Sequence, residues 1–153
     1  MIKFASASAA ESAFYSAFEQ ADLPRMMEIW ARNDNVVCIH PGAPRMEGVA
    51  QVRESWMELF RDPPILKFSL LDVRVTKTEG LAIHQVREEI EIDGQYISMM
   101  LSTNVYERGV DSNWYMTSRH SSPEPDDYLM DDEEFSPEDD DDHNLAKEAV
   151  VLH

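Results

Sequence analysis

The hydrophobic period of this chain changes once, near residue 64, and that change limits the folds open to it. Before it, apolar residues recur every three to four positions, which is typical of amphipathic helices. After it, apolar and polar residues alternate over the stretches 65–76, 81–92, 95–107 and 113–120, which is typical of half-buried strands. Helices followed by strands predict an α+β fold, with the helices covering one face of a curved sheet.

The helical half divides into three helices and one short strand. The first helix has its apolar face at Ala10, Ala13, Phe14, Ala17, Phe18 and Ala21. Asp22 is the expected N-cap of the second helix, because Pro24 then falls in the first turn, where a missing N–H is tolerated. A strand is expected at 36–40, a loop or small hairpin at 44–48, and a third helix whose face includes Val52 and Trp56.

The strand half contains three turn signals. Asp93-Gly94 is the strongest of them, because this dipeptide suits the tight turn of a two-residue hairpin. Glu79-Gly80 and Arg108-Gly109 suit the other two turns. Long strands joined by tight turns predict an antiparallel sheet.

Charge is distributed unevenly along the 153 residues. The chain has 30 acidic and 13 Lys or Arg residues, and 13 of the acids lie in residues 124–153 beside a single base. We therefore expect a domain at 1–123 and an acidic tail at 124–153. The tail is either solvated, an arm for a basic partner, or an autoinhibitory flap over the pocket mouth. The negative charge argues against nucleic acid and against anionic membranes as partners.

The remaining composition indicates a cytoplasmic protein. Cys38 is the only cysteine, so no internal disulfide forms, and it lies in an apolar run that predicts a buried thiol. No run of 18 apolar residues is present, which argues against a membrane-spanning helix.

Three strings in this order resemble the nuclear-transport-factor-2-like superfamily, in particular its SnoaL-like and ketosteroid-isomerase-like branch. The first string is Asp22-Leu23 with Met27 and Trp30. The second is His40-Pro41-Gly42, followed by Gly48, Val52, Ser55-Trp56 and Leu59-Phe60. The third is Trp114, Met116, His120 and Ser122-Pro123. Together they cover about residues 10–123.

The resemblance implies a cone-shaped barrel, in which a strongly curved antiparallel sheet wraps around the first helix and leaves a pocket at the open end. It also implies a small hydrophobic molecule as ligand and a homodimer formed through the outer face of the sheet. One departure is Ala21, where the family usually has glycine, and we expect only a small local change from it.

The groups that ketosteroid isomerase chemistry needs are not retained. That reaction uses an Asp base, with a Tyr and a protonated Asp that stabilise the oxyanion. The Tyr position falls on Phe14, with Tyr15 one residue away, and the base position falls on His40. The second Asp position falls near Thr103 or Asn104. Isomerase activity by this mechanism is therefore not expected.

Four polar residues remain as catalytic candidates: His40, His84, Glu88 and His120. In a cone they would converge on one cavity, and a His with a carboxylate partner serves as a general base near neutral pH. Strand alternation places Trp114, Met116, Ser118 and His120 on one face. The expected pocket walls are Phe14, Trp30, Trp56, Phe60, Met100 and Trp114. The structural alternative is that these are satisfied core residues, with Glu88 paired to Arg74 or Arg119.

Two functions stay open at this point. One is an enzyme that acts on a small hydrophobic substrate by His-mediated proton transfer. The other is a non-catalytic dimerisation or protein-interaction module, with a small or filled pocket. No cofactor is expected, and no metal centre either, because no His-x-His or His-x-x-x-His spacing occurs.

Overall fold

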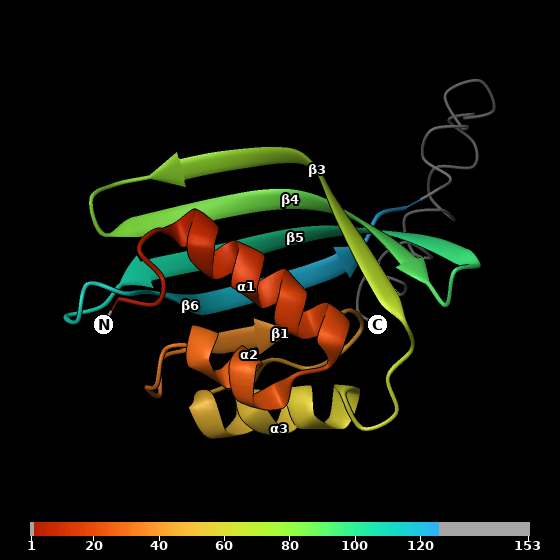
Figure 1. The fold of residues 1–153 in the computed structure, drawn as a ribbon, viewed down its shortest axis with the longest axis horizontal. Helices are drawn as coiled ribbons and strands as arrows, with labels where there is room; N and C mark the ends of the chain where they lie inside the picture. The colour runs from red at the N-terminus through yellow and green to blue at the C-terminus, as the bar shows by residue number, and fades with distance from the viewer. Residues whose placement is uncertain (1, 126–153) are drawn as a thin grey trace, which may run out of the picture. The chain divides into compact units, whose positions relative to one another are not determined.

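The structure is a computed structural model that describes residues 2–125. Its elements are α1 (Ala7–Gln20), α2 (Leu23–Ile29), β1 (Val37–Ile39), β2 (Met46–Glu47), α3 (Val49–Leu59), β3 (Leu66–Lys77), β4 (Leu81–Ile92), β5 (Tyr96–Arg108) and β6 (Trp114–Pro123). The predicted α+β order is confirmed (Figure 1). The expected acidic tail lies, from residue 126 onward, outside the described residues.

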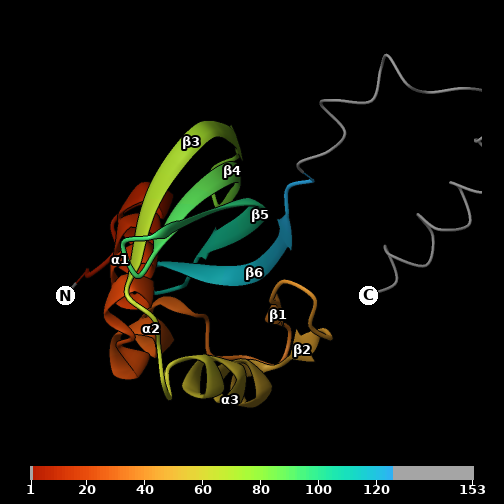
Figure 2. The ribbon, with the colours of Figure 1, turned by 90° about the vertical axis from the view of Figure 1, so that its right-hand side faces the viewer.

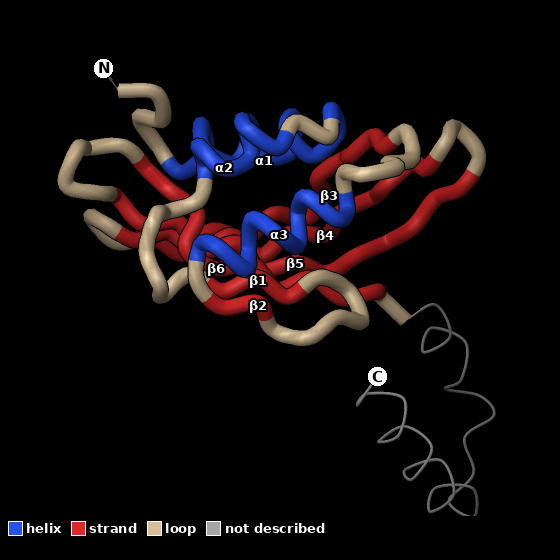
Figure 3. The backbone as a smooth tube through the Cα atoms, turned by 90° about the horizontal axis from the view of Figure 1, so that it is seen from below, coloured by secondary structure: helices blue, strands red, loops and turns tan. Residues whose placement is uncertain are grey.

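One six-stranded sheet carries all the strands, in the order β2-β1-β6-β5-β4-β3. The helices lie on one side of this curved sheet (Figures 2 and 3). We call the side toward the helices the inner face and the opposite side the outer face. The long strands pair antiparallel, as predicted. The short strand β1 pairs parallel to β6, a pairing that the sequence did not predict. None of the helices in residues 2–125 is long and apolar enough to cross a bilayer.

Side-chain caps fix the N-terminal ends of the first two helices. Ser6 caps α1 by accepting a hydrogen bond from the Ala9 N–H at 3.0 Å. The predicted N-cap of α2 is confirmed, because Asp22 accepts from the Arg25 N–H at 3.0 Å. Between them Ala21 adopts a left-handed conformation, with φ 51° and ψ 43°. This conformation explains why glycine suits the position.

A tight turn at Asp93-Gly94 joins β4 to β5. Asp93 and Gly94 have φ values of 53° and 70°, and the Gln95 N–H donates to the Ile92 carbonyl at 3.0 Å. The turn lies at the predicted dipeptide, but Ile92 pairs with Tyr96, so three residues rather than two separate the strands. From it the pairing runs without a break to His84, which lies opposite Asn104.

A β-bulge in β6 changes which side chains face inward. Val105 pairs with Ser118 and Tyr106 with Met116, so Thr117 is the extra residue. The expectation that His120 shares a face with Trp114 and Met116 is therefore wrong. Met116 is buried, whereas His120 is exposed on the outer face, and Arg119 points inward instead.

Aromatic rings fill the space between α1, α3 and the sheet. Trp56 is fully buried, and its ring lies 5.7 Å from Phe14, 4.9 Å from Phe18 and 5.5 Å from Phe60. Phe14 and Trp30 are also fully buried in the core, with Phe60 and Trp114 packed against it. Five of the six expected pocket walls are therefore part of the hydrophobic core or packed against it.

Replacing Ala21 with glycine should stabilise the domain by roughly 0.5–1 kcal/mol, because glycine adopts the left-handed conformation without a Cβ clash. The matched control is Ser12→Gly in the exposed middle of α1, which should cost about 0.5 kcal/mol. Urea unfolding of the three proteins measures both effects. Destabilisation by Ala21→Gly would contradict the assigned conformation.

Candidate functional site

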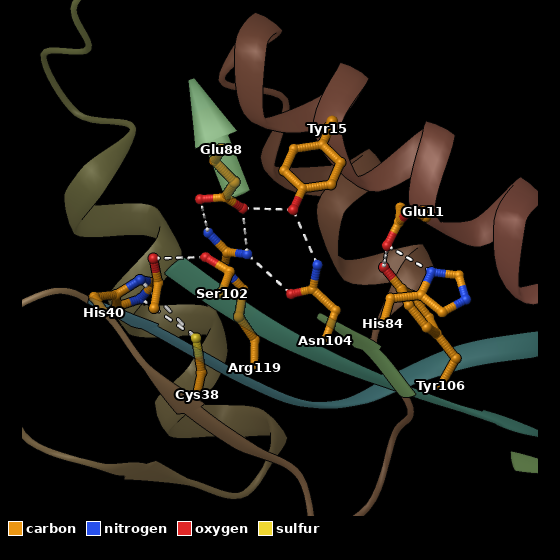
Figure 4. Close-up of polar contacts among 11 residues, drawn as sticks. Glu11, Tyr15, Cys38, His40, His84, Glu88, Ser102, Asn104, Tyr106 and Arg119 are labelled. Carbon is orange, nitrogen blue, oxygen red and sulfur yellow. Dashed lines mark hydrogen bonds and ion pairs between the residues drawn. The ribbon is translucent and has the colours of Figure 1, made fainter. Parts of the chain in front are cut away.

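Four buried polar side chains form a closed ring of hydrogen bonds on the inner face (Figure 4). Arg119 on β6 donates to Glu88 on β4 through both terminal nitrogens, at 2.8 and 3.2 Å. The same guanidinium donates to Asn104 Oδ1 on β5 at 2.9 Å. Asn104 Nδ2 donates to the Tyr15 hydroxyl on α1 at 2.9 Å, and that hydroxyl donates to Glu88. The ring therefore joins α1 to three strands.

Solvent is excluded from this ring. Glu88 and Asn104 are 0% exposed and Arg119 is 3% exposed. The Arg119 guanidinium also lies 5.0 Å from the centre of the Phe14 ring, a cation–π contact on its apolar side. Two charges at such depth are retained only when they are paired and hydrogen-bonded, because their desolvation is costly.

The buried position and the ring partners shift the pKa values of Tyr15 and Arg119. Burial raises the pKa of Tyr15 well above its usual range, with Glu88 adding to the effect and Arg119 opposing it. Burial lowers the pKa of Arg119, whereas the charge and hydrogen bonds of the Glu88 carboxylate raise it, and the net shift is upward. Tyr15 is therefore a neutral hydrogen-bond donor and Arg119 a permanent cation at neutral pH.

A second polar cluster lies beside the first, one turn earlier on α1. Glu11 Oε2 is 2.8 Å from His84 Nδ1 and accepts from the Tyr106 hydroxyl at 3.0 Å. All three side chains are buried. Burial raises the pKa of Tyr106, and the Glu11 carboxylate raises it further. His84 thus has the carboxylate partner that a general base needs, but it is only 3% exposed.

His40 belongs to neither cluster. Its Nε2 is 3.0 Å from Ser55 Oγ, and its ring meets the Trp56 ring edge-on at 4.7 Å. The Ser55 hydroxyl donates to the Val52 carbonyl at 2.7 Å, so its single proton is committed and His40 Nε2 is the donor toward it. Burial lowers the pKa of His40 to about 4, and the charge of Arg119 adds to this. Ser55 is consequently not activated as a nucleophile.

The buried thiol of Cys38 lies near His40. Cys38 Sγ is 3.7 Å from His40 Nε2, and burial raises the pKa of the thiol to about 12, so the thiolate does not form at neutral pH. Among the buried side-chain nitrogen and oxygen atoms of residues 2–125, two have no hydrogen-bond partner. They are the indole nitrogens Nε1 of Trp30 and Trp56.

His120 lies on the outer face, away from these clusters. It lines a groove of about 350 Å³ together with Asp72, Arg74, Gln85, Thr103 and Ser122. The four catalytic candidates therefore do not meet in one cavity: His84 and Glu88 lie in adjacent buried clusters, His40 lies apart, and His120 lies on the opposite face. Within the described part of the chain, no group of His, Cys, Asp and Glu side chains is arranged to hold a metal ion.

Sequence reasoning missed most partners of the two inner clusters. It singled out His84 and Glu88, and the alternative pairing of Glu88 with Arg119 is confirmed. Glu11 and Tyr106 were not singled out, and Tyr15 and Asn104 were named only beside the expected positions of isomerase groups. The spacing of Glu11 and Tyr15 by one helical turn was a usable signal, since such residues share a face.

A curved six-stranded sheet with helices on its inner face is the architecture of a nuclear-transport-factor-2-like domain. The chain matches the SnoaL-like domain family over residues 8–126. This protein therefore belongs to the SnoaL-like domain family, as the three sequence strings indicated. A search of curated proteins found no significant match.

Solved structures agree with this assignment. A protein from Thiobacillus denitrificans, provisionally assigned as a calcium/calmodulin-dependent protein kinase type II association domain, is 35% identical with a TM-score of 0.73. The match covers 82% of this chain and all of that one. A provisionally assigned dehydratase of the same superfamily from Streptomyces avermitilis is 29% identical over 77% of this chain and 93% of its own, with a TM-score of 0.69.

The fold is also shared at lower identity. A ketosteroid isomerase-like protein from Erwinia carotovora atroseptica is 18% identical, with a TM-score of 0.64, over 77% of this chain and 94% of its own. At this identity the likeness concerns the fold alone.

Glu88→Gln should destabilise the domain by about 3–5 kcal/mol, because it leaves the buried Arg119 guanidinium without a counter-charge. The control is Glu47→Gln, which removes an exposed pair with Arg45 and should cost about 0–1 kcal/mol. The double variant Glu88→Leu/Arg119→Met should recover most of the loss. Urea unfolding compares the variants, and equal losses at Glu88 and Glu47 would contradict the buried pair.

His40 should lower the free energy of unfolding as the pH falls. Its pKa is near 6.5 in the unfolded chain and about 4 in the folded one, so between these values only the unfolded chain binds the proton. The free energy of unfolding should therefore fall as pH drops from about 6.5 to about 4, and His40→Gln should lack this part of the decline. NMR titration of the His40 ring gives the direct check. A folded-state midpoint near 6.5 would overturn the expectation.

Proposed function

We propose that this chain is a non-catalytic self-association module, a homodimer that forms through the outer face of its sheet. The observation that carries the proposal is the apolar outer face. Leu71, Ile97 and Leu101 are 37%, 60% and 40% exposed there, and none of the described helices covers them. Exposed apolar side chains gathered on one face are typical of interaction surfaces.

The arrangement of the histidines favours association over proton transfer. Each of the two inward histidines is engaged by neighbours, His84 by Glu11 and His40 by Ser55 and Trp56. His120 faces the other side of the sheet. A general base must reach a substrate proton within hydrogen-bond distance, and the packed aromatic interior leaves the His84 ring only 3% exposed.

Similarity to solved structures adds support. The Thiobacillus denitrificans protein, provisionally assigned as an association domain, aligns over its whole length with this chain. Self-association is consistent with that assignment. The proposal places the protein in the cytoplasm, with residues 124–153 as a separate acidic tail.

A second function is favoured by the buried Glu88–Arg119 pair, because buried charges are unusual in a domain that needs only a stable core. In this alternative the inner face binds a small hydrophobic molecule carrying one polar group. Tyr15 and Asn104 would position that group, and His84 or His40 would serve in proton transfer.

Leu101→Glu should convert the dimer to a monomer, with dimer affinity reduced roughly 100-fold or more, because a two-fold interface contains each substitution twice. Native mass spectrometry of the full-length chain measures the oligomer and any bound molecule together. The control is Val110→Glu, at a fully exposed residue in the β5–β6 loop, which should leave the mass unchanged.

Two results would contradict the first proposal. A wild-type protein that stays monomeric at tens of micromolar would remove self-association. A non-covalent organic mass on the wild-type protein, lost in Glu88→Gln, would favour the small-molecule function.

A further inference from the structure

β3 forms the longer of the two edges of the sheet. The strand order runs from β2 to β3, so each of these strands has one side without a neighbouring strand among residues 2–125. β2 contains two residues and β3 contains twelve. An edge strand presents a row of backbone N–H and C=O groups that can pair with a strand of another molecule. β3 is therefore the edge at which this sheet can be extended.

One backbone donor on this edge is held by a side chain instead of a strand. The Phe68 N–H donates to Glu19 Oε2 on α1 at 2.8 Å, in a contact exposed to solvent. Because N–H and C=O groups point alternately to the two sides of a strand, those of Leu66 and Leu70 point the same way as those of Phe68. Glu19 occupies one of these groups, and an exposed hydrogen bond is exchanged for another at little cost.

The regular part of the edge ends at a β-bulge. Residues 66–71 pair with β4 in one register, which shifts between Leu71 and Arg74. Asp72 has a φ of 46° at this point. A bulge bends its strand and interrupts a straight edge. A second strand can therefore follow the edge over about six residues, centred near Phe68.

A hollow of about 320 Å³ lies beside this edge. Lys67 and Ser69 line it from β3, and Glu89 and Glu91 line it from β4. Ser69 pairs with Glu89 and lies between it and the edge. Because serine is small, a long side chain on an added strand can pass over Ser69 and reach the Glu89 carboxylate. The hollow thus suits a Lys or Arg side chain from a neighbouring strand.

β3 itself has the sequence that this edge requires. When two copies of β3 pair antiparallel about Phe68, each Phe68 lies opposite its own copy and Leu66 lies opposite the partner's Leu70. On the other side of the strand the partner's Lys67 lies opposite Ser69, which directs its ammonium group toward Glu89. Apolar pairs and opposite charges are both stabilising combinations across strands.

We infer that two copies join edge to edge, with their β3 strands antiparallel about Phe68 and with Lys67 of each copy paired to Glu89 of the other. This contact goes beyond the proposed outer-face dimer, because it extends the sheet instead of stacking two sheets. It buries a small area, so it forms at hundreds of micromolar, above the concentrations at which the outer-face dimer forms. Glu19 weakens it further, since it must release the Phe68 N–H before the strands pair.

Charge exchange tests the inference on the full-length chain in the Leu101→Glu background, in which the outer-face contact is broken. Lys67→Glu and Glu89→Lys should each weaken edge-to-edge association at least about 10-fold, because like charges then meet. The combined variant Lys67→Glu/Glu89→Lys restores opposite charges and should associate with nearly the affinity of the background protein. Sedimentation equilibrium at up to hundreds of micromolar measures these affinities.

A second variant tests the contact that competes with strand pairing. Glu19→Ala should tighten the association several-fold, because the Phe68 N–H is then available. The matched controls Arg53→Glu and Glu54→Lys make the same charge changes as the edge variants at exposed positions of α3, on the helical side of the sheet (Figure 3). They should leave the association unchanged. Hydrogen exchange at the Leu70 amide gives a direct readout and should slow as the protein concentration rises.

The outcomes separate this inference from the proposed function. Recovery of affinity in the combined variant supports the edge contact and shows that the single variants lost it through charge. Two single losses without recovery, equal affinities in all variants, or weaker association of Glu19→Ala overturn it.

The oligomeric state of the parent proteins completes the test. A Leu101→Glu protein that stays monomeric at every concentration, beside a wild-type dimer, overturns the edge contact alone. A wild-type protein that is monomeric at tens of micromolar, but pairs through β3 at higher concentration, overturns the outer-face proposal alone.

Discussion

The ion pair between Glu88 and Arg119 holds the inner face of this domain together. Its two partners come from β4 and β6, which are not adjacent, and Asn104 on the intervening β5 completes the bridge. Tyr15 ties α1 to the same point. Because every member is buried, water cannot replace a lost partner, and a shift of α1 along the sheet would leave a charge unpaired. The pair therefore fixes where the first helix lies on the sheet.

How far the sequence predicts this arrangement differs between strands. The place of the β4–β5 turn follows from Asp93-Gly94, but the register does not. A two-residue turn would pair Ile92 with Gln95 and so place His84 opposite Thr103, whereas Ile92 pairs with Tyr96 and His84 lies opposite Asn104. The face of Arg119 was not predictable by alternation, since the extra residue Thr117 reverses the pattern within β6. The same bulge explains why His120 was expected inside the domain. Local rules locate each hairpin turn, whereas the register beyond the turn and the position of a bulge depend on how the whole sheet bends.

The two faces of the sheet use charge in different ways. Inside, opposite charges lie within hydrogen-bond distance and are fully paired, so they set the position of α1 rather than attract a partner. Outside, the charged side chains of β4 lie beside the exposed Leu71 and Leu101. A single strand serves both purposes, because alternate side chains point to opposite faces. The twelve residues of β4 thus contribute both to the buried clusters and to the surface proposed for self-association.

The parallel pairing of β1 with β6 has a consequence for how the chain acquires its structure. Val37 lies beside Ser118, and Glu11 on α1 contacts Tyr106, so segments from the two ends of the domain must meet. Contacts of such long sequence separation slow folding, because a large loop must close before they form. During synthesis on a ribosome, the helices emerge before the four long strands on which they pack. The sheet can be completed only after its last strand has been synthesised. Until then the apolar side chains of the helices lack the sheet surface that buries them in the folded domain.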